Sequence, residues 1–181
     1  MSLKQYLSEV NSAIMLLDPF LLDKAIVLFK ETIMKNKKII VAGNGGSAAI
    51  ASHFVIDLSR CTLDGKFVTR SLSLNDNVPV LTATANDLGY DLIFEYQLER
   101  IAREDDLFIT ISSSGNSPNI IKAIECAQRL NLRTIAFSGF DGGESSKLSE
   151  VALVTSTEFK NYGPTEDAHA ILCHYIARVL H

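Results

Sequence analysis

The sequence lacks the features that mark several common protein classes. Its formal net charge is -4 at pH 7, so it has no basic excess with which to bind nucleic acid. No apolar run is long enough to cross a bilayer, and charged residues throughout the N-terminal segment argue against a signal peptide. The three cysteines, Cys61, Cys126 and Cys173, form no Cys-x-x-Cys motif. We therefore expect reduced, buried thiols in a cytoplasmic protein that binds neither nucleic acid nor membranes.

Linkers, internal repeats and low-complexity segments are also absent. The 181 residues predict a single domain, with a helical segment at 1–36 and an α/β core at 37–181. Apolar runs predict strands at 39–42, 68–74, 107–111, 133–138 and 151–154. Helices are expected at 3–17, 19–36, 47–58, 78–85, 91–103, 117–130, 144–148 and 165–180. Apolar strands that alternate with helices indicate a doubly wound α/β fold, with a parallel sheet covered on both faces.

Two loops rich in glycine and serine each follow a predicted strand. Residues 43–47 read Gly-Asn-Gly-Gly-Ser, and residues 112–117 read Ser-Ser-Ser-Gly-Asn-Ser. Small residues let the backbone turn sharply, and the helix that follows presents free N–H groups and the positive end of its dipole. Because the carboxyl ends of parallel strands share one edge of a sheet, we expect both loops there, at a site for an anion such as phosphate. The alternative is that the serines only cap helices.

Two kinds of nucleotide site have little support. The first loop lacks the Gly-Lys-Ser/Thr of a P-loop. Gly43, Gly45 and Ala48 fit the looser dinucleotide fingerprint, but the acidic residue expected about 20 positions later has no clear counterpart, since Asp64 falls in a predicted turn with Gly65. The four hydroxyls at 112, 113, 114 and 117 would instead saturate a single phosphate group, which is what a sugar phosphate offers.

Three of the four histidines lie in two predicted helices. His53 and Asp57 are spaced i, i+4 and share a helix face, while the terminal helix carries Glu166, Asp167, His169 and His174. Such groups on two helices could form an acid/base pair or bind a zinc-type metal. The alternative is a solvated helix face, which we favour for Asp167 and His169. Glu166 and His174 are eight positions apart, about 12 Å along a helix, so Glu166 is the least certain ligand.

These residues together resemble one family, the phosphoheptose (sedoheptulose 7-phosphate) isomerases of the sugar isomerase (SIS) domain superfamily. The resemblance extends from about residue 36 to the end of the chain. The matching segments are 43–49, 53–54, 85–90, 111–117, 138–139 and 141–143, with Phe94 and Gln97. The family implies a five-stranded parallel sheet flanked by helices, and a homotetramer with active sites at subunit interfaces.

The resemblance also implies roles for individual residues. The sugar phosphate would be bound by Asn44, Gly45, Gly46, Ser47, Asn86, Asp87, Ser112, Ser113, Ser114 and Ser117. Asp57 takes the position of the catalytic base, and His174 that of its partner acid/base. Some members bind one zinc ion per subunit at the positions of His53, Asp57, Glu166 and His174. Three departures from the pattern are Asp57 for glutamate, Glu166 for glutamine and Pro164 for arginine.

We therefore expect an aldose–ketose isomerase that converts sedoheptulose 7-phosphate into a heptose 7-phosphate for bacterial surface glycans through an enediol. One alternative is an isomerase of a different phosphosugar. Another is a non-catalytic relative that senses sugar phosphates or binds the bacterial replication initiator, against which the presence of His53, Asp57 and His174 argues. Leu3, Leu7, Val10, Ile14 and Leu17 form an apolar stripe at helical spacing. We expect this stripe to lie in the interface of a homotetramer, although it could belong to the core of one chain.

Overall fold

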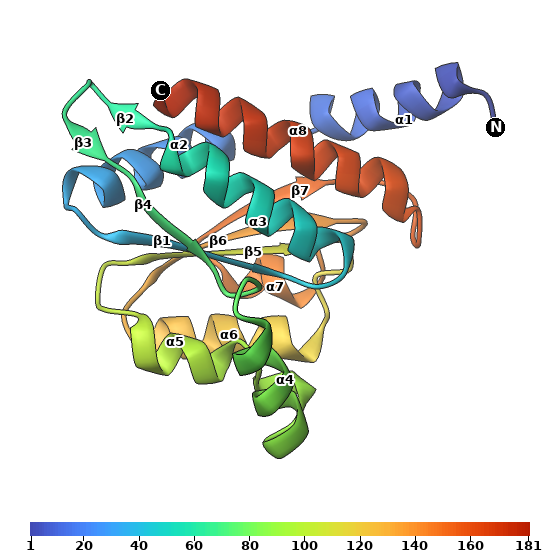
Figure 1. The fold of residues 1–181 in the computed structure, drawn as a ribbon. Coiled ribbons are helices and arrows are strands. Elements are labelled where there is room, and N and C mark those ends of the chain that lie inside the picture. The colour runs from blue at the N-terminus through green and yellow to red at the C-terminus, as the bar shows by residue number, and fades with distance from the viewer.

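A five-stranded parallel sheet forms the centre of the computed structural model, which describes residues 1–181 (Figure 1). The strands lie in the order β4-β1-β5-β6-β7, which confirms the doubly wound sheet predicted from the sequence. Their bounds are β1 Lys38–Gly43, β4 Arg70–Ser73, β5 Leu107–Ser112, β6 Arg133–Gly139 and β7 Val151–Thr155. The helices are α1 Leu3–Met15, α2 Pro19–Met34, α3 Gly46–Ser59, α4 Val78–Asp87, α5 Glu95–Ile101, α6 Pro118–Arg129, α7 Gly143–Leu148 and α8 Tyr162–Leu180.

Two predicted elements are divided in the structure. The strand expected at 68–74 is interrupted, because β3 (Phe67–Val68) turns back to pair antiparallel with β2 (Thr62–Leu63) before β4 begins. Asp64 and Gly65 form the turn between them, with φ of 54° and 65°, as the sequence predicted. The helix expected at 91–103 is a 3-10 turn, η1 (Tyr90–Leu92), followed by α5. Ile93 and Phe94 break it, since both are buried in the core at the point where the chain changes direction.

Each face of the sheet has its own hydrophobic core, because side chains alternate along a strand. Ile39 and Val41 of β1 belong to the cluster beneath α2, α3 and α8. Ile40 and Ala42 belong to the cluster beneath α5 and α6. The two layers of helices lie above and below the sheet in Figure 1. Apart from α4, the elements that carry predicted site residues meet at the carboxyl edge of the sheet or on its α3 and α8 face.

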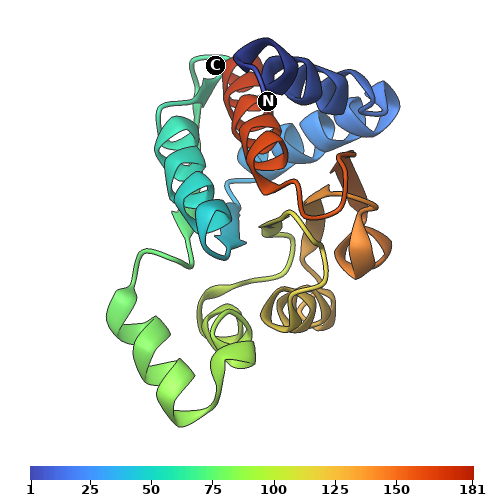
Figure 2. The ribbon, with the colours of Figure 1, turned by 90° about the vertical axis from the view of Figure 1, so that its right-hand side faces the viewer.

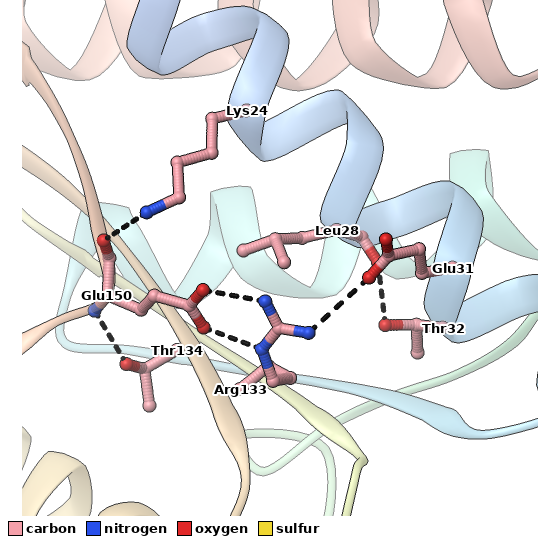
Figure 3. A network of polar contacts seen from close by, with 7 residues as sticks. All are labelled: Lys24, Leu28, Glu31, Thr32, Arg133, Thr134 and Glu150. Atoms are coloured by element: carbon pink, nitrogen blue, oxygen red, sulfur yellow. Dashed lines mark hydrogen bonds and ion pairs between the residues drawn. The ribbon is translucent and has the colours of Figure 1, made fainter.

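The amino-terminal edge of the sheet is held by an ion-pair network (Figure 3). Arg133, at the start of β6, donates from Nε and Nη2 to the two carboxylate oxygens of Glu150, each at 2.6 Å. Its Nη1 also lies 3.4 Å from Glu31 of α2. This side-chain hydrogen bonding lowers the pKa of Glu150. The network ties α2 to β6 and β7 at the edge opposite the two glycine- and serine-rich loops.

The N-terminal helix α1 packs on α8, and its outer face is exposed. The Tyr6 hydroxyl donates to Asp167 at 2.6 Å, and Val10 is buried against the domain. Leu3 and Leu7 of the predicted stripe are 73% and 57% exposed. Part of the stripe thus belongs to the core of this chain, and part is free for another subunit. None of the helices combines the length and the apolar character that crossing a membrane requires.

Candidate active site

The two glycine- and serine-rich loops meet at the carboxyl edge of the sheet, as the sequence predicted. They enclose a cavity of about 160 Å³, called here the serine pocket. It is lined by Asn44, Ser47, Ser112, Ser113, Ser114, Ser117, Tyr162 and Glu166. The helices α3 and α6 begin at this pocket, and neither has a side-chain cap. The first N–H groups of α3 and the dipoles of both helices are therefore available to an anion, whereas Pro118 at the start of α6 has no N–H.

The serine hydroxyls fall into two groups. Ser112 and Ser114 accept hydrogen bonds from the backbone N–H groups of Gly115 and Asn116, each at 3.2 Å, and so shape the loop. The hydroxyls of Ser47 and Ser117 make no hydrogen bond within the chain, and that of Ser113 is buried without a partner. Ser117 therefore does not cap α6 with its side chain, contrary to the alternative interpretation. The hydroxyls of Ser47 and Ser117 are therefore free to bind a ligand.

An amide clamp, which we define as Asn44 and Asn119, joins the first loop to α6. Each Nδ2 donates to the other residue's Oδ1 at 2.9 Å, and the Tyr90 hydroxyl donates to Asn44 Oδ1 at 2.9 Å. Asn119 is only 1% exposed. Asn119 was not among the residues predicted from the sequence, and Tyr90 was given no role there. The one available signal was an asparagine just inside a predicted helix that follows a serine loop. The clamp fixes the spacing of the two helix N-termini that face the serine pocket.

The segment 142–145 supports the serine loop. Gly115 has a φ of 63° and lies so close to the Gly142 carbonyl that a side chain at 115 would collide with it. Ser145 N–H donates to the Gly115 carbonyl at 2.9 Å, and Glu144 N–H donates to Asn116 Oδ1 at 2.9 Å. This glycine is therefore required by a close backbone approach, and the contact holds the serine loop in its shape.

A second group of polar side chains, called here the histidine cluster, lies on α3 and α8. These helices pack side by side and run in the same direction from the carboxyl edge (Figures 1 and 2). The Nε2 atoms of His53 and His174 are 2.9 Å apart. Asp57 Oδ2 lies 3.4 Å from His53 Nε2 and 3.5 Å from His174 Nε2. The structure thus brings together three of the four residues expected at this site.

The histidine cluster groups side chains that could hold a metal ion. Ligand atoms about 2.0–2.1 Å from a tetrahedral zinc ion lie about 3.3 Å from one another, close to the distances of Asp57 Oδ2 from the two imidazoles, while the 2.9 Å between the imidazoles is shorter. Asp57 Oδ2 is buried and has no conventional hydrogen-bond donor, as expected of an atom that needs a cation. The nearby Cys61 is not part of this group, since its thiol donates to the backbone carbonyls of Asp57 and Ala177 at 3.4 and 3.2 Å. Both imidazoles are more than half exposed, which leaves a coordination position open.

The other α8 residues singled out from the sequence, Glu166, Asp167 and His169, lie away from the histidine cluster. Glu166 lines the serine pocket, so the structure does not bring it to His174. Asp167 is exposed and accepts the hydrogen bond from Tyr6, as a surface residue would. The solvated-face interpretation of His169 is wrong, because this residue is fully buried. It lies in line with Thr165, Cys173 and Ile176, which face the sheet at helical spacing.

The two remaining predicted substrate residues, Asn86 and Asp87, stand apart from the serine pocket within one chain. Asn86 Nδ2 donates to Asp87 Oδ1 at 2.8 Å at the end of α4. Asp87 lines a different cavity, of about 420 Å³, together with Pro79, Val80, Ala83, Thr84, Leu88 and Tyr96. Their role in binding the sugar remains a prediction.

Comparison with known proteins gives consistent matches. The family model of the SIS domain matches residues 5–139. A phosphoheptose isomerase of Helicobacter pylori is 37% identical over 86% of this chain and 80% of that protein. A probable phosphoheptose isomerase of Thermoplasma volcanium is 34% identical over 99% of this chain and 91% of that protein. The solved structure of a phosphoheptose isomerase from Francisella tularensis superposes with a TM-score of 0.87 at 25% identity, covering 98% of this chain and 93% of that one.

Proposed function

Since this chain belongs to the SIS domain family and is 37% identical to a curated phosphoheptose isomerase, we propose that it is an aldose–ketose isomerase of phosphorylated sugars. Its substrate is sedoheptulose 7-phosphate, which it converts into a heptose 7-phosphate. The observation that carries this proposal is the parallel packing of α3 and α8. The serine pocket lies at one end of the helix pair, and His53, Asp57 and His174 lie farther along it, which supports a phosphate site at the first position and proton transfer at the second.

The spacing of the two sites suits a long sugar chain. His53 follows Gly46 by seven residues on α3, a rise of about 10 Å. An extended seven-carbon sugar has eight bonds between C1 and its phosphorus, and at roughly 1.2 Å per bond along an extended chain it spans about 10 Å. With the phosphate in the serine pocket, C1 and C2 reach the histidine cluster. Binding of the remote phosphate orients the carbons that react.

The histidine cluster supplies the two proton transfers that isomerisation needs. Asp57 carries the proton between C1 and C2, because its carboxylate is the only one in the cluster. His174 moves the proton between the oxygens on C1 and C2. The 2.9 Å contact between its Nε2 and that of His53 requires one imidazole to donate and the other to accept. The tautomers of the two imidazoles are therefore coupled.

The same three residues, His53, Asp57 and His174, fit a zinc ion. Zinc bound there would polarise the sugar oxygens as a Lewis acid. Glu166 would join these ligands only if its side chain left the serine pocket.

The assembly we propose is a homotetramer in which partner subunits cover the exposed apolar surface. Leu3, Met15, Leu16 and Phe20 are each at least 69% exposed on the N-terminal helices. The histidine cluster is also open to solvent in one chain, where a reacting sugar would be poorly shielded from water.

The decisive experiment is turnover of a panel of ketose phosphates of five, six and seven carbons, with zinc and with a chelator. We expect the seven-carbon substrate to react fastest. Asp57→Asn and His174→Ala should each lower kcat at least about a hundredfold, while the exposed Asp23→Asn control retains it. Near wild-type turnover by either cluster variant would refute the role of that residue. Faster turnover of a shorter sugar would reassign the substrate, and turnover of none would favour a non-catalytic sugar-phosphate sensor.

A further inference from the structure

One carboxylate lies inside the pocket that is otherwise built for an anion. Glu166 is the only charged residue among those that line the serine pocket. Its carboxyl carbon lies 2.7 Å from the point where a Cβ on Gly46 would lie. Gly46 is the first residue of α3, so the absence of a side chain there creates the space that the carboxylate fills. The negative group therefore sits against the positive end of the α3 dipole.

Nothing else in the chain accounts for this placement. The Glu166 side chain forms no ion pair and no hydrogen bond with another residue, while its neighbour Asp167 accepts a hydrogen bond from Tyr6. The free hydroxyls of Ser47 and Ser117 line the same pocket. A phosphate bound by these hydroxyls and by the α3 N-terminus would share a small cavity with a like charge.

The repulsion between the two groups is large enough to control binding. A carboxylate about 5 Å from a phosphate dianion weakens phosphate affinity roughly tenfold even at the dielectric constant of water, and more in a partly buried pocket. The Glu166 side chain can turn away, because its carboxylate is held by no partner. A ligand that also binds outside the phosphate position can drive this movement with the free energy of those further contacts. A free anion makes few such contacts.

We propose that Glu166 is an internal anion that holds the phosphate position of the serine pocket until a sugar phosphate displaces it. This inference rests on the proposed function, since it assigns the serine pocket to the substrate's phosphate. Glu166 is then a specificity-determining residue. It discriminates against inorganic phosphate and other small anions, whose binding cannot offset the displacement, and in favour of phosphates that carry a sugar.

The test compares the affinity of inorganic phosphate for three proteins by isothermal titration calorimetry at fixed ionic strength with a chelator present. Glu166→Gln keeps the size of the side chain and removes its charge. Glu158→Gln is the matched control, because Glu158 is exposed and lies outside the serine pocket. We expect Glu166→Gln to bind phosphate about tenfold more tightly than wild type, and Glu158→Gln to bind it like wild type. Glu166→Ala, which removes the carboxylate altogether, should also bind more tightly.

Each other result has a definite meaning. Equal or weaker binding by both Glu166 variants would overturn the inference and leave the phosphate site intact. An equal gain in Glu158→Gln would also overturn it, because the effect would then come from net charge alone. Phosphate binding by none of the proteins would overturn both the site and the inference. Tighter binding by the Glu166 variants without turnover of any ketose phosphate would support the inference and refute only the isomerase activity.

Discussion

The buried imidazole of His169 should make the stability of this protein depend on pH. His169 is fully buried, and its ring packs on Phe137 with the ring centres 6.5 Å apart. Neither ring nitrogen has a hydrogen-bond partner of good geometry. Burial lowers the pKa of His169 from 6.5 to about 4, and the backbone of Ser138 offsets this only in part. The folded protein therefore keeps this imidazole neutral at a pH where an unfolded chain would protonate it.

The sign and size of the effect follow from the two pKa values. The difference of 6.5 − 4, about 2.5 units, corresponds to about 3 kcal/mol at 1.36 kcal/mol per unit. The unfolded state takes up a proton below pH 6.5, whereas the folded state does not until about pH 4. The free energy of unfolding therefore decreases as the pH is lowered from 6.5 to about 4. The slope approaches about 1.4 kcal/mol per pH unit for this one residue.

The assay is urea unfolding at one protein concentration, monitored by circular dichroism, at about pH 7.5, 6.5, 5.5 and 5. His169→Phe should remove about one proton's worth of slope between pH 6.5 and 5, whatever its stability at pH 7.5. His181→Gln is the control, since His181 is exposed at the chain end and should leave the slope unchanged. If His169→Phe and wild type have the same slope, then His169 titrates normally and is not buried as described.

Three further predictions concern other parts of the molecule. Glu150→Gln should lower the free energy of unfolding by about 1–2 kcal/mol at pH 7, because it removes the charge and leaves Arg133 one acceptor oxygen instead of two. Since the pKa of Glu150 is lowered, this loss should shrink as the pH falls below 4.5, and an equal loss at pH 3 and pH 7 would contradict the assignment. Ser117→Ala should weaken phosphate binding about threefold to tenfold in calorimetry with little change in Tm, because its hydroxyl has no partner within the chain; a large drop in Tm with unchanged affinity would show a structural role instead. Light scattering at micromolar concentration should report a mass several times that of the chain, and a particle of 19.9 kDa would refute the oligomer.

The sheet and the two loops could be predicted from the sequence because their causes are local. The apolar runs alternate with helical segments along the chain, and this order already requires parallel strands with both faces covered. The glycines and serines after β1 and β5 mark the turns at the carboxyl edge. The i, i+4 spacing of His53 and Asp57 likewise places both on one helix face before any packing is known.

The contacts between distant segments could not be predicted in this way. Asn44 and Asn119 are 75 positions apart, and nothing local indicates that their amides pair. His169 was expected in solvent because the pattern of α8 did not reveal which of its faces would meet the sheet. Tertiary packing decides which face of α8 is buried. The free energy of burying Cys173, Ile176 and Leu180 outweighs the desolvation of one neutral imidazole on the same face.

The sequence by itself determined which chemical groups are present and which helices and loops carry them. The tertiary structure alone decided how these groups divide into two sites. Since α3 and α8 pack in parallel, residues that begin each helix lie together and residues about two turns later lie together. Glu166 therefore lies beside Gly46 in the serine pocket, while His174 lies beside His53 and Asp57. The relative direction of two helices more than a hundred positions apart depends on the burial of their apolar faces against the sheet, which no local pattern of residues records.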